Sequence, residues 1–329
     1  MKQKKLIGVS LPTDMLMRWK NDGDIIKEGL ESAGYEVDLK YAGMDYTTQY
    51  SQVKEMIENK CEVIVITGIG ADGWVETLAE AKKANIPVIA YDRLILESDA
   101  VSYYVTFNNF SVGVKQAEYI VDNLNLNNED ANTYNIEIFA GDSGDLNAKT
   151  FYNGAMSILE QYINSGKLIV KSSKTSFSDV STMNWSTEIA QSRMGSLITD
   201  YYKDGTQIDA ILCSNDSVAL GVKYALVADY TGAWPIITGQ DCDIENVKNM
   251  IDGLQSMSVF KDTSVSSSRV VEMVKEIASG STPTVNDTTT HNNGVKTVPS
   301  YLCEPFVCTV DNYKELLIDS GYYREEDLK

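Results

Sequence analysis

Polar, charged and aromatic side chains stand at or near the end of nearly every predicted strand of this 329-residue chain. Carboxylates, planar amides and guanidinium groups can each bridge two neighbouring hydroxyl groups, because a hydroxyl both donates and accepts a hydrogen bond. An indole can cover an apolar C–H face. These groups therefore predict a binding site for a polyol. The candidates are Arg18, Trp19, Asp92, Arg93, Asp145, Asn147, Trp185, Asn215, Asp241 and Lys261.

Residue counts and charge disfavour several other kinds of site. The chain carries 28 Lys+Arg against 47 Asp+Glu, a net charge of −19, which repels phosphate backbones and anionic lipid surfaces. It has a single histidine, His291, so Ser-His-Asp, Cys-His and multi-histidine metal sites are disfavoured. We expect no catalytic residue, metal, cofactor or nucleic-acid partner.

Some of the polar residues also have simpler explanations. Asp216, ahead of a predicted helix, is expected to be the N-cap of that helix, and Asp145 or Asn147 could cap the helix that starts near residue 148. Trp185 could cover part of a core. The prediction of a binding site therefore depends on the convergence of many such groups and not on any one of them.

Paired carboxylates for glycoside hydrolysis are a second possibility, because Asp142, Asp145 and Asp241 could meet. Such a reaction needs one carboxylic acid with a raised pKa. Arg93 and Lys261 would instead keep nearby carboxylates ionised, which disfavours hydrolysis.

Short apolar strands alternate with helical patterns along most of the chain. Examples are the strands at 6–12, 62–67, 86–92 and 209–214, each rich in valine and isoleucine and followed by a helical pattern. Such alternation predicts parallel sheets covered by helices on both faces. Two successive series, and an irregular stretch at 280–298, favour two doubly wound domains over a barrel. Ligands of such sheets bind beyond the carboxyl ends of the strands, where the candidates stand.

One motif indicates a different function. Gly68, Gly70 and Gly73 form a G-x-G-x-x-G pattern after a strand, with Asp92 at the end of the next strand, as in a dinucleotide-binding site. The motif follows the third strand instead of the first, and the bulky Trp74 comes directly after it. An NAD(P)-dependent oxidoreductase therefore remains as the alternative, and a flexible glycine-rich turn is favoured.

Several motifs resemble one known family. These are RWKNDGD from Arg18, VIAYDRLI from Val88, FAGDSGDLNAKTFYNGAM from Phe139, CSND from Cys213, TGQDCD from Thr238 and MSVFKDT from Met257. The chain resembles, nearly from end to end, the periplasmic sugar-binding proteins of ABC importers, in the branch of xylose-binding and multiple-sugar-binding proteins.

The resemblance implies a role for each candidate residue. It implies that Arg18 and Trp19 form a first-loop pair, that Asp92 and Arg93 clamp hydroxyls, and that Trp185 stacks on the sugar ring. It implies further polar contacts from Asp145, Asn147, Asn215, Asp241 and Lys261. Leu146 departs from the polar residue that relatives often carry, which affects sugar selectivity. Asp241→Ala is then expected to abolish sugar binding with little loss of fold.

The family fold is the type I periplasmic binding protein, in which two lobes are joined by three crossovers and close about a hinge on the ligand. The resemblance implies one lobe that combines 1–108 with 261–292 and a second lobe that combines 109–260 with 293–329. The ligand cleft would lie between the lobes. The crossovers would lie near 106–110, 257–261 and 292–296. A related repressor core would need a DNA-binding segment ahead of Leu6, where only five residues stand.

The same resemblance implies a monomer that captures an aldopentose or aldohexose such as xylose, glucose, galactose or arabinose. It would deliver the sugar to an importer permease, and to a chemoreceptor as a further partner. The expected location is the periplasm or the cell exterior, with a lipid anchor. Whether Cys303 pairs with Cys308 stays open at this point.

Overall fold

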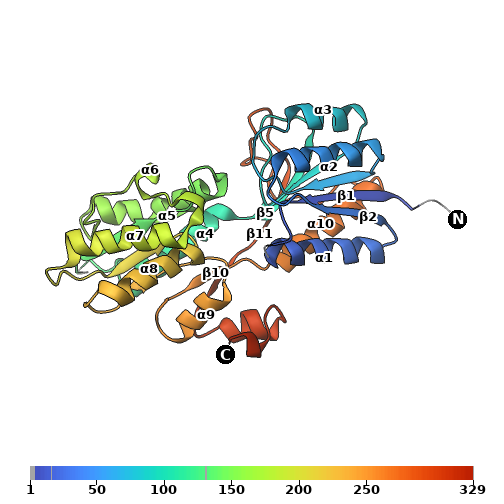
Figure 1. Ribbon diagram of the computed structural model, residues 1–329. Helices are drawn as coiled ribbons and strands as arrows, with labels where there is room; N and C mark the ends of the chain where they lie inside the picture. Colours follow the sequence, from blue (N-terminus) through green and yellow to red (C-terminus); the bar gives the residue numbers. More distant parts are fainter. Residues whose placement is uncertain (1–3, 16, 130–131, 329) are drawn as a thin grey trace. The chain divides into compact units, whose positions relative to one another are not determined.

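A computed structural model describes residues 4–15, 17–129 and 132–328 of the chain (Figure 1). The chain divides into two compact units. Unit 1 combines the part up to Phe107 with Asp262–Cys303, and unit 2 combines Asn108–Lys261 with the part from Glu304 onward. The chain therefore passes between the units at three points.

The first two crossing points lie one residue from the boundaries expected from the sequence, whereas the third differs. The sequence placed residues 293–303 in the second lobe, but these residues belong to unit 1. The reason is strand pairing, because β11 (Ser300–Cys303) pairs in parallel with β5 (Val101–Phe107). The main chain of Asn293 also accepts a hydrogen bond of 2.7 Å from the Glu97 N–H, so this stretch is tied to unit 1 before the strand begins.

Unit 1 contains one parallel sheet with the strand order β11-β5-β4-β3-β1-β2. Its other strands are β1 (Leu6–Leu11), β2 (Glu36–Tyr41), β3 (Val63–Ile66) and β4 (Val88–Tyr91). Its helices are α1 (Met17–Ser32), α2 (Tyr46–Glu58), α3 (Val75–Lys83) and α10 (Thr263–Ala278). Figure 1 shows helices on both faces of this sheet.

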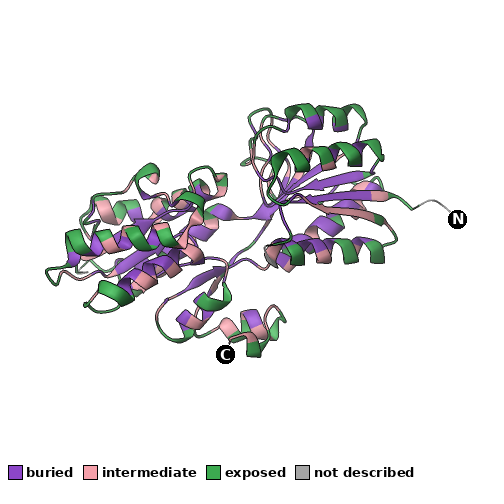
Figure 2. Cartoon of the chain, viewed as in Figure 1, coloured by how far each residue is buried: buried purple, intermediate pink, exposed green. Residues whose placement is uncertain are grey.

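The central strands β3 and β4 of unit 1 are apolar and buried at every position, because both faces of the sheet are covered there. In β3, Val63 and Val65 pack with side chains of α1 and α10, whereas Ile64 and Ile66 pack with side chains of α2 and α3. Successive side chains of a strand point to opposite faces, so a strand buried on both sides reads as a continuous apolar run. Figure 2 shows these strands as buried and the outer helix faces as exposed.

Unit 2 repeats this architecture with a smaller parallel sheet of order β7-β6-β8-β9. The strands are β6 (Tyr134–Phe139), β7 (Leu168–Ile169), β8 (Ala210–Cys213) and β9 (Ile236–Ile237). A separate antiparallel pair consists of β10 (Ser258–Phe260) and β12 (Phe306–Cys308). The helices are α4 (Asn109–Asn123), α5 (Leu146–Asn164), α6 (Phe177–Val180), α7 (Thr187–Leu197), α8 (Asp216–Asp229) and α9 (Ile244–Ile251).

As in unit 1, alternate side chains of β8 pack into the cores on opposite faces of the sheet. Ala210 and Leu212 pack with α4 and α5, and Ile211 and Cys213 pack with α7 and α8. The doubly wound α/β class expected from the sequence is therefore confirmed for each unit.

Two elements of unit 2 are irregular. Helix α7 ends at Leu197, and the chain continues directly as a π-helical turn over Ile198–Tyr202. Strand β7 lies at the sheet edge, has a single neighbour and pairs only at Leu168–Ile169. Within the described ranges, no helix combines the length and the apolar character needed to cross a membrane.

Candidate ligand-binding site

The predicted site residues form two groups, one on each unit. The unit 1 cluster consists of Arg18, Trp19, Asp92 and Arg93, and the unit 2 cluster consists of Asp145, Asn147, Trp185, Asn215, Asp241 and Lys261. Most follow the carboxyl ends of parallel strands, the edge at which doubly wound sheets bind ligands.

An ion pair between Arg18 and Asp92 is the centre of the unit 1 cluster. Arg18 is on the first turn of α1, and its Nη2 contacts Oδ1 of Asp92, which follows β4. Asp92 is only 7% exposed. A nearly buried carboxylate is stabilised by a charged partner, and its oxygens remain strong acceptors for hydroxyl groups.

The backbone at Asp92 adopts a left-handed conformation with φ 63°, which is uncommon for a residue other than glycine but tolerated by aspartate. The Asp92 carbonyl accepts hydrogen bonds from the Tyr104 hydroxyl at 2.8 Å and the Thr106 hydroxyl at 3.2 Å. These bonds hold the turn, and the turn directs the Asp92 carboxylate toward Arg18.

Trp19 supports the two guanidinium groups of the cluster. The Arg18 guanidinium carbon lies 4.4 Å from the centroid of the Trp19 ring, and that of Arg93 lies 5.9 Å from it. Trp19 itself is 4% exposed. Its indole therefore orders the arginines by cation–π contact more than it offers a surface to a ligand.

The second partner of Arg18 is the buried Asp22. Arg18 Nε lies 3.8 Å from Asp22 Oδ2, and the same carboxylate oxygen accepts a 2.8 Å hydrogen bond from the Tyr91 hydroxyl. The Tyr91 hydroxyl also contacts the hydroxyls of Ser266 and Ser267 on α10. Burial raises the pKa of Asp22 to about 6, and this effect exceeds the opposing influence of Arg18.

Asp22→Asn should increase the stability of the protein more at pH 8 than at pH 5. The pKa of Asp22 is about 6 in the folded protein and about 4 when unfolded. The folded state therefore binds more protons between these values, and its stability falls as the pH rises from about 4 through 6. The variant should lack this loss, which amounts to about 3 kcal/mol in full, since one unit of pKa difference corresponds to about 1.4 kcal/mol.

Urea unfolding of both proteins at several pH values, followed by circular dichroism, measures the difference. The asparagine of the variant can still accept the Tyr91 hydrogen bond, so the comparison separates this group from the other titrating carboxylates. A stability difference that does not change between pH 5 and pH 8 would contradict the prediction.

The glycine motif of unit 1 is packed against aromatic side chains. A Cβ at Gly70 would lie 2.7 Å from the Tyr46 ring, and one at Gly73 would lie 2.3 Å from the Tyr50 hydroxyl oxygen. The Trp74 indole donates a 3.0 Å hydrogen bond to the Gly70 carbonyl. Tyrosines of α2 thus fill the space that the glycines leave, where a pyrophosphate would have to approach.

The carbonyl groups of this turn accept hydrogen bonds from a residue of the unit 1 cluster. Arg93 Nη1 donates to the Ile69 carbonyl at 2.9 Å and to the Gly68 carbonyl at 3.3 Å. The turn therefore orients Arg93, and its geometry does not support the dinucleotide alternative.

In the unit 2 cluster, Asp241 pairs with Lys261. Lys261 Nζ lies 3.1 Å from Asp241 Oδ1 and 5.5 Å from the centroid of the Phe151 ring. Lys261 is 8% exposed, whereas the Asp241 side chain is 35% exposed. Asp241 also has a left-handed backbone with φ 99°. Strain of this kind at a non-glycine residue persists only where the surroundings impose it, and it is typical of functional sites.

Trp185 lies over a glycine of the strand-end loop. A Cβ built on Gly141 would be 2.0 Å from the Trp185 ring, so only glycine allows the indole to lie there. Trp185 and the preceding Asn184 both have positive φ, and the Asn184 N–H donates to Oδ2 of Asp142. The indole also meets Phe151 edge to face, with the ring centroids 6.3 Å apart.

Gly141→Ala should displace the Trp185 indole and weaken ligand binding by roughly fivefold, because the ring contact is worth about 1 kcal/mol. Gly195→Ala is the matched control, because a Cβ there meets nothing within 4 Å and the backbone is helical. Isothermal titration with the ligand measures the affinity, and near-ultraviolet circular dichroism measures the displacement of the indole. Equal affinities for both variants would show that the Trp185 position does not matter.

The amide and carboxylate residues of the unit 2 cluster also begin helices. Asp145 caps α5 by accepting from the Asn147 N–H at 2.9 Å, and Asn215 caps α8 by accepting from the Val218 N–H at 3.0 Å. The Asn147 side-chain oxygen accepts a 2.9 Å hydrogen bond from Asn109 Nδ2.

The prediction that Asp216 is a helix N-cap is wrong, because Asn215 has that role and Asp216 is the first residue of α8. The carboxylate of Asp216 is fully buried and accepts hydrogen bonds from Ser258 Oγ at 2.9 Å, Gln255 Nε2 at 2.9 Å and the Asp243 N–H at 2.8 Å. Burial, followed by the charge of Asp243, raises the pKa of Asp216 well above its usual value. Asp216 is thus a structural group behind the cluster.

Sequence reasoning missed two residues that organise unit 2. Phe151 contacts both Trp185 and Lys261, and Asn109 orients Asn147. Phe151 lies four residues after Asn147 on α5, so the two share one face of the helix. That spacing was a usable signal for Phe151. The approach of Asn109 on α4 to α5 depends on helix packing and had no such signal.

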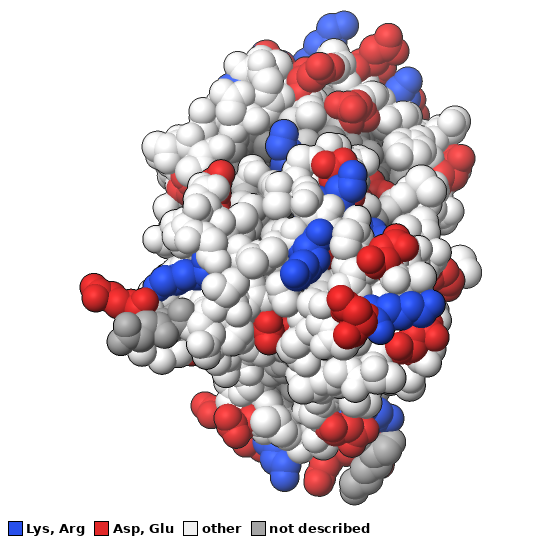
Figure 3. All heavy atoms as spheres, turned by 90° about the vertical axis from the view of Figure 1, so that its left-hand side faces the viewer, with Lys and Arg blue, Asp and Glu red and all other residues white. Residues whose placement is uncertain are grey.

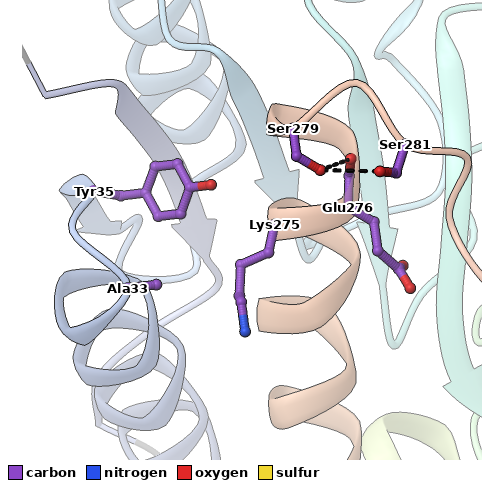
Figure 4. A pocket seen from close by; sticks show the side chains of 6 residues that line it. All are labelled: Ala33, Tyr35, Lys275, Glu276, Ser279 and Ser281. Atoms are coloured by element: carbon purple, nitrogen blue, oxygen red, sulfur yellow. Dashed lines mark hydrogen bonds between the residues drawn. The ribbon is translucent and has the colours of Figure 1, made fainter.

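Other surface features lie apart from the two clusters. A shallow pocket of about 340 Å³ lies where α1 and α10 end, at the amino edge of the sheet (Figure 4), and it is lined by Ala33, Tyr35, Lys275, Glu276, Ser279 and Ser281. None of these is a candidate site residue. On the face drawn in Figure 3, acidic and basic side chains of the described residues are interspersed.

Comparisons with known proteins agree with the fold. The sequence model of the periplasmic binding protein domain matches residues 7–282. The multiple sugar-binding periplasmic receptor of Rhizobium radiobacter is 44% identical over 330 residues, covering 99% of this chain and 93% of the relative. The D-xylose-binding periplasmic protein of Escherichia coli is 33% identical, covering 98% and 92% of the two chains.

One solved structure has a higher sequence identity to this chain than these two relatives have. The solute-binding protein of an ABC transporter from Clostridium phytofermentans, with bound β-D-glucose, is 57% identical and superposes with a TM-score of 0.92. The similarity covers 99% of this chain and 100% of that structure.

Proposed function

The chain belongs to the periplasmic binding protein family, and on this premise we propose that it captures a monosaccharide outside the cytoplasmic membrane and delivers it to the permease of an ABC importer. The family consists of binding proteins and not of enzymes. The observation that carries the proposal is the 57% identity to a solute-binding protein that holds β-D-glucose. We therefore propose an aldopyranose, glucose first and xylose second, as the ligand.

The chemistry of both clusters supports this ligand class. Each cluster contains an ion pair, Arg18 with Asp92 and Lys261 with Asp241, in which the carboxylate is the acceptor and the cation is the donor. A sugar hydroxyl can donate to the first and accept from the second. Trp185 supplies an aromatic ring for the C–H face of the pyranose.

Isothermal titration calorimetry against D-glucose, D-xylose, D-galactose and L-arabinose, with NAD and ATP alongside, tests the proposal. We expect at least one aldose to bind and neither nucleotide to do so. Binding of NAD, or the absence of heat with every aldose at millimolar concentration, would overturn it. The order of affinities among the four sugars identifies the ligand, because these sugars differ by one hydroxymethyl group or one hydroxyl epimer.

We further propose a monomer that is anchored to the cell surface by a lipid and also presents its sugar-bound form to a chemoreceptor. Support comes from the relatives, whose names place them in the periplasm and call one of them a receptor. Light scattering with and without sugar tests the monomer, and cell fractionation of the native host tests the anchor.

A further inference from the structure

Two buried cysteines of unit 2 flank the same serine. Cys308 on β12 lies directly opposite Ser258 of β10 in the antiparallel pair. Cys242, which follows Asp241, donates its main-chain N–H to Ser258 Oγ at 3.0 Å, and its Sγ lies 3.8 Å from the Ser258 carbonyl oxygen. Both cysteines are free thiols with 0% exposure.

The two cysteines also belong to the same buried core cluster, with Phe260 and Leu317. Burial is the main cause that raises the pKa of the Cys242 thiol well above its usual value, and the side chain of Cys308, within hydrogen-bonding reach, raises it further. The strand register at Ser258, the hydrogen bond from Cys242 to the same serine and the shared core cluster together place the two cysteine side chains in one small region of the core. The sequence left open whether Cys303 pairs with Cys308, and Cys303 is the last residue of β11 in unit 1.

These cysteines lie on two parts of the chain that contact each other, the loop that follows β9 and the C-terminal end of the chain. We call residues 304–328 the C-terminal segment. It contains β12, a π-helical turn at Lys314–Asp319 and a 3₁₀ turn at Glu325–Leu328. The Tyr323 hydroxyl donates to the Cys242 carbonyl at 3.0 Å, and the Tyr322 ring meets Phe260 with centroids 4.8 Å apart.

We propose that Cys242 and Cys308 are a site of disulfide formation that fastens the C-terminal segment to the loop carrying Asp241. The oxidant is a low-molecular-weight disulfide, and the site is independent of which ligand the protein binds. Because both sulfur atoms are buried, the bond forms when the C-terminal segment opens locally or before it packs during folding.

The exchange is balanced without any other reactant. The thiolate of one cysteine attacks the small disulfide, forming a mixed disulfide and releasing one small thiolate, which takes up the proton that the cysteine lost. The second cysteine then attacks the protein sulfur of the mixed disulfide. The Cys242–Cys308 bond forms, and a second small thiol leaves with the proton of the second cysteine. Two protein thiols are oxidised, and one small disulfide is reduced to two thiols.

Oxidation should raise the unfolding temperature of unit 2. A bond between Cys242 and Cys308 closes a long loop of the unfolded chain, and bonds of this kind raise the midpoint of a domain by roughly 5–10 °C. The oxidised protein should also resist proteolysis within the C-terminal segment, because the segment can no longer detach.

The experiment uses the full chain and oxidised glutathione as the probe. The protein is incubated with it in mild urea, returned to buffer, blocked with an alkylating reagent and digested without reduction. Mass spectrometry should find the peptide of Cys242 linked to that of Cys308, with the loss of two hydrogen atoms. A link between Cys303 and Cys308, glutathione adducts alone, or unmodified thiols would each overturn the proposal.

Two cysteine variants distinguish the effects of the Cys242–Cys308 bond from other effects of oxidation. Cys308→Ser should abolish both the linked peptide and the rise in unfolding temperature. Cys213→Ser, which changes an equally buried cysteine of the same unit, should retain both. A Cys308→Ser protein that still gains stability on oxidation would contradict the proposal, and the peptide map of the unaltered protein tests it even where a variant does not fold.

Discussion

Replacing Asp241 with glycine is expected to weaken sugar binding on the order of 100-fold while the protein stays folded, because a hydrogen bond to a charged acceptor contributes up to about 3 kcal/mol. The carboxylate is the exposed partner of its ion pair, and Lys261 is the buried one. Loss of Asp241 therefore removes an acceptor for hydroxyl groups and frees the ammonium group that it holds in place.

Glycine is a better test at this position than alanine. Asp241 has φ 99°, where an alanine would keep the backbone strain and lose the side chain that helps to hold it. Glycine adopts this conformation without cost. Lys261 keeps a counter-charge after the substitution, since Asp243 also interacts with it electrostatically. The unfolding temperature should therefore change little.

Isothermal titration with the best ligand of the aldose panel measures the affinity, and thermal unfolding measures the fold. Asp252→Gly is the matched control, since it makes the same change at an exposed residue after α9 in the same unit. If Asp241→Gly binds sugar as the unaltered protein does, Asp241 is not part of the site.

Asp92→Asn is expected to reduce sugar affinity on the order of 100-fold, since it replaces a charged acceptor by a neutral one and breaks the ion pair with Arg18. Asparagine is the appropriate replacement because it tolerates the left-handed backbone of this position, φ 63°. The hydrogen bonds from Tyr104 and Thr106 go to the main-chain carbonyl and are retained.

The same calorimetric panel measures this variant. Asp99→Asn is its control, because Asp99 pairs with Lys82 at an exposed place in the same unit. The control should bind as the unaltered protein does. Equal affinity of the two variants would show that the Arg18–Asp92 pair does not contribute to binding.

The fold could be predicted from the sequence because the apolar patterns of the individual strands and helices agree with the doubly wound α/β architecture that they form together. Strands such as β3, with four apolar residues buried on both faces, are typical only of a covered parallel sheet. Helix starts were predictable to about two residues where caps such as Asp145 stand.

The parts that could not be predicted depend on contacts between distant segments. Nothing local shows that residues 293–303 return to β5, that Cys308 and Cys242 pack in one core cluster, or that Asn109 reaches Asn147. Asp216 was misassigned because an acidic residue next to a helix start is equally suited to the cap and to the first turn. Its complete burial follows from Ser258 and Gln255, which are about forty residues away in sequence.

The interleaving of the two units has a consequence for the order in which the protein can fold during synthesis. The apolar face of the unit 1 sheet that β1, β3 and β5 build is covered in part by Val270, Val274 and neighbouring residues of α10, and its edge is completed by β11. Both elements emerge from the ribosome after all of the unit 2 sheet. A nascent chain therefore carries an incomplete first sheet until it is almost finished, so unit 1 can complete its core only after most of the polypeptide has been synthesised.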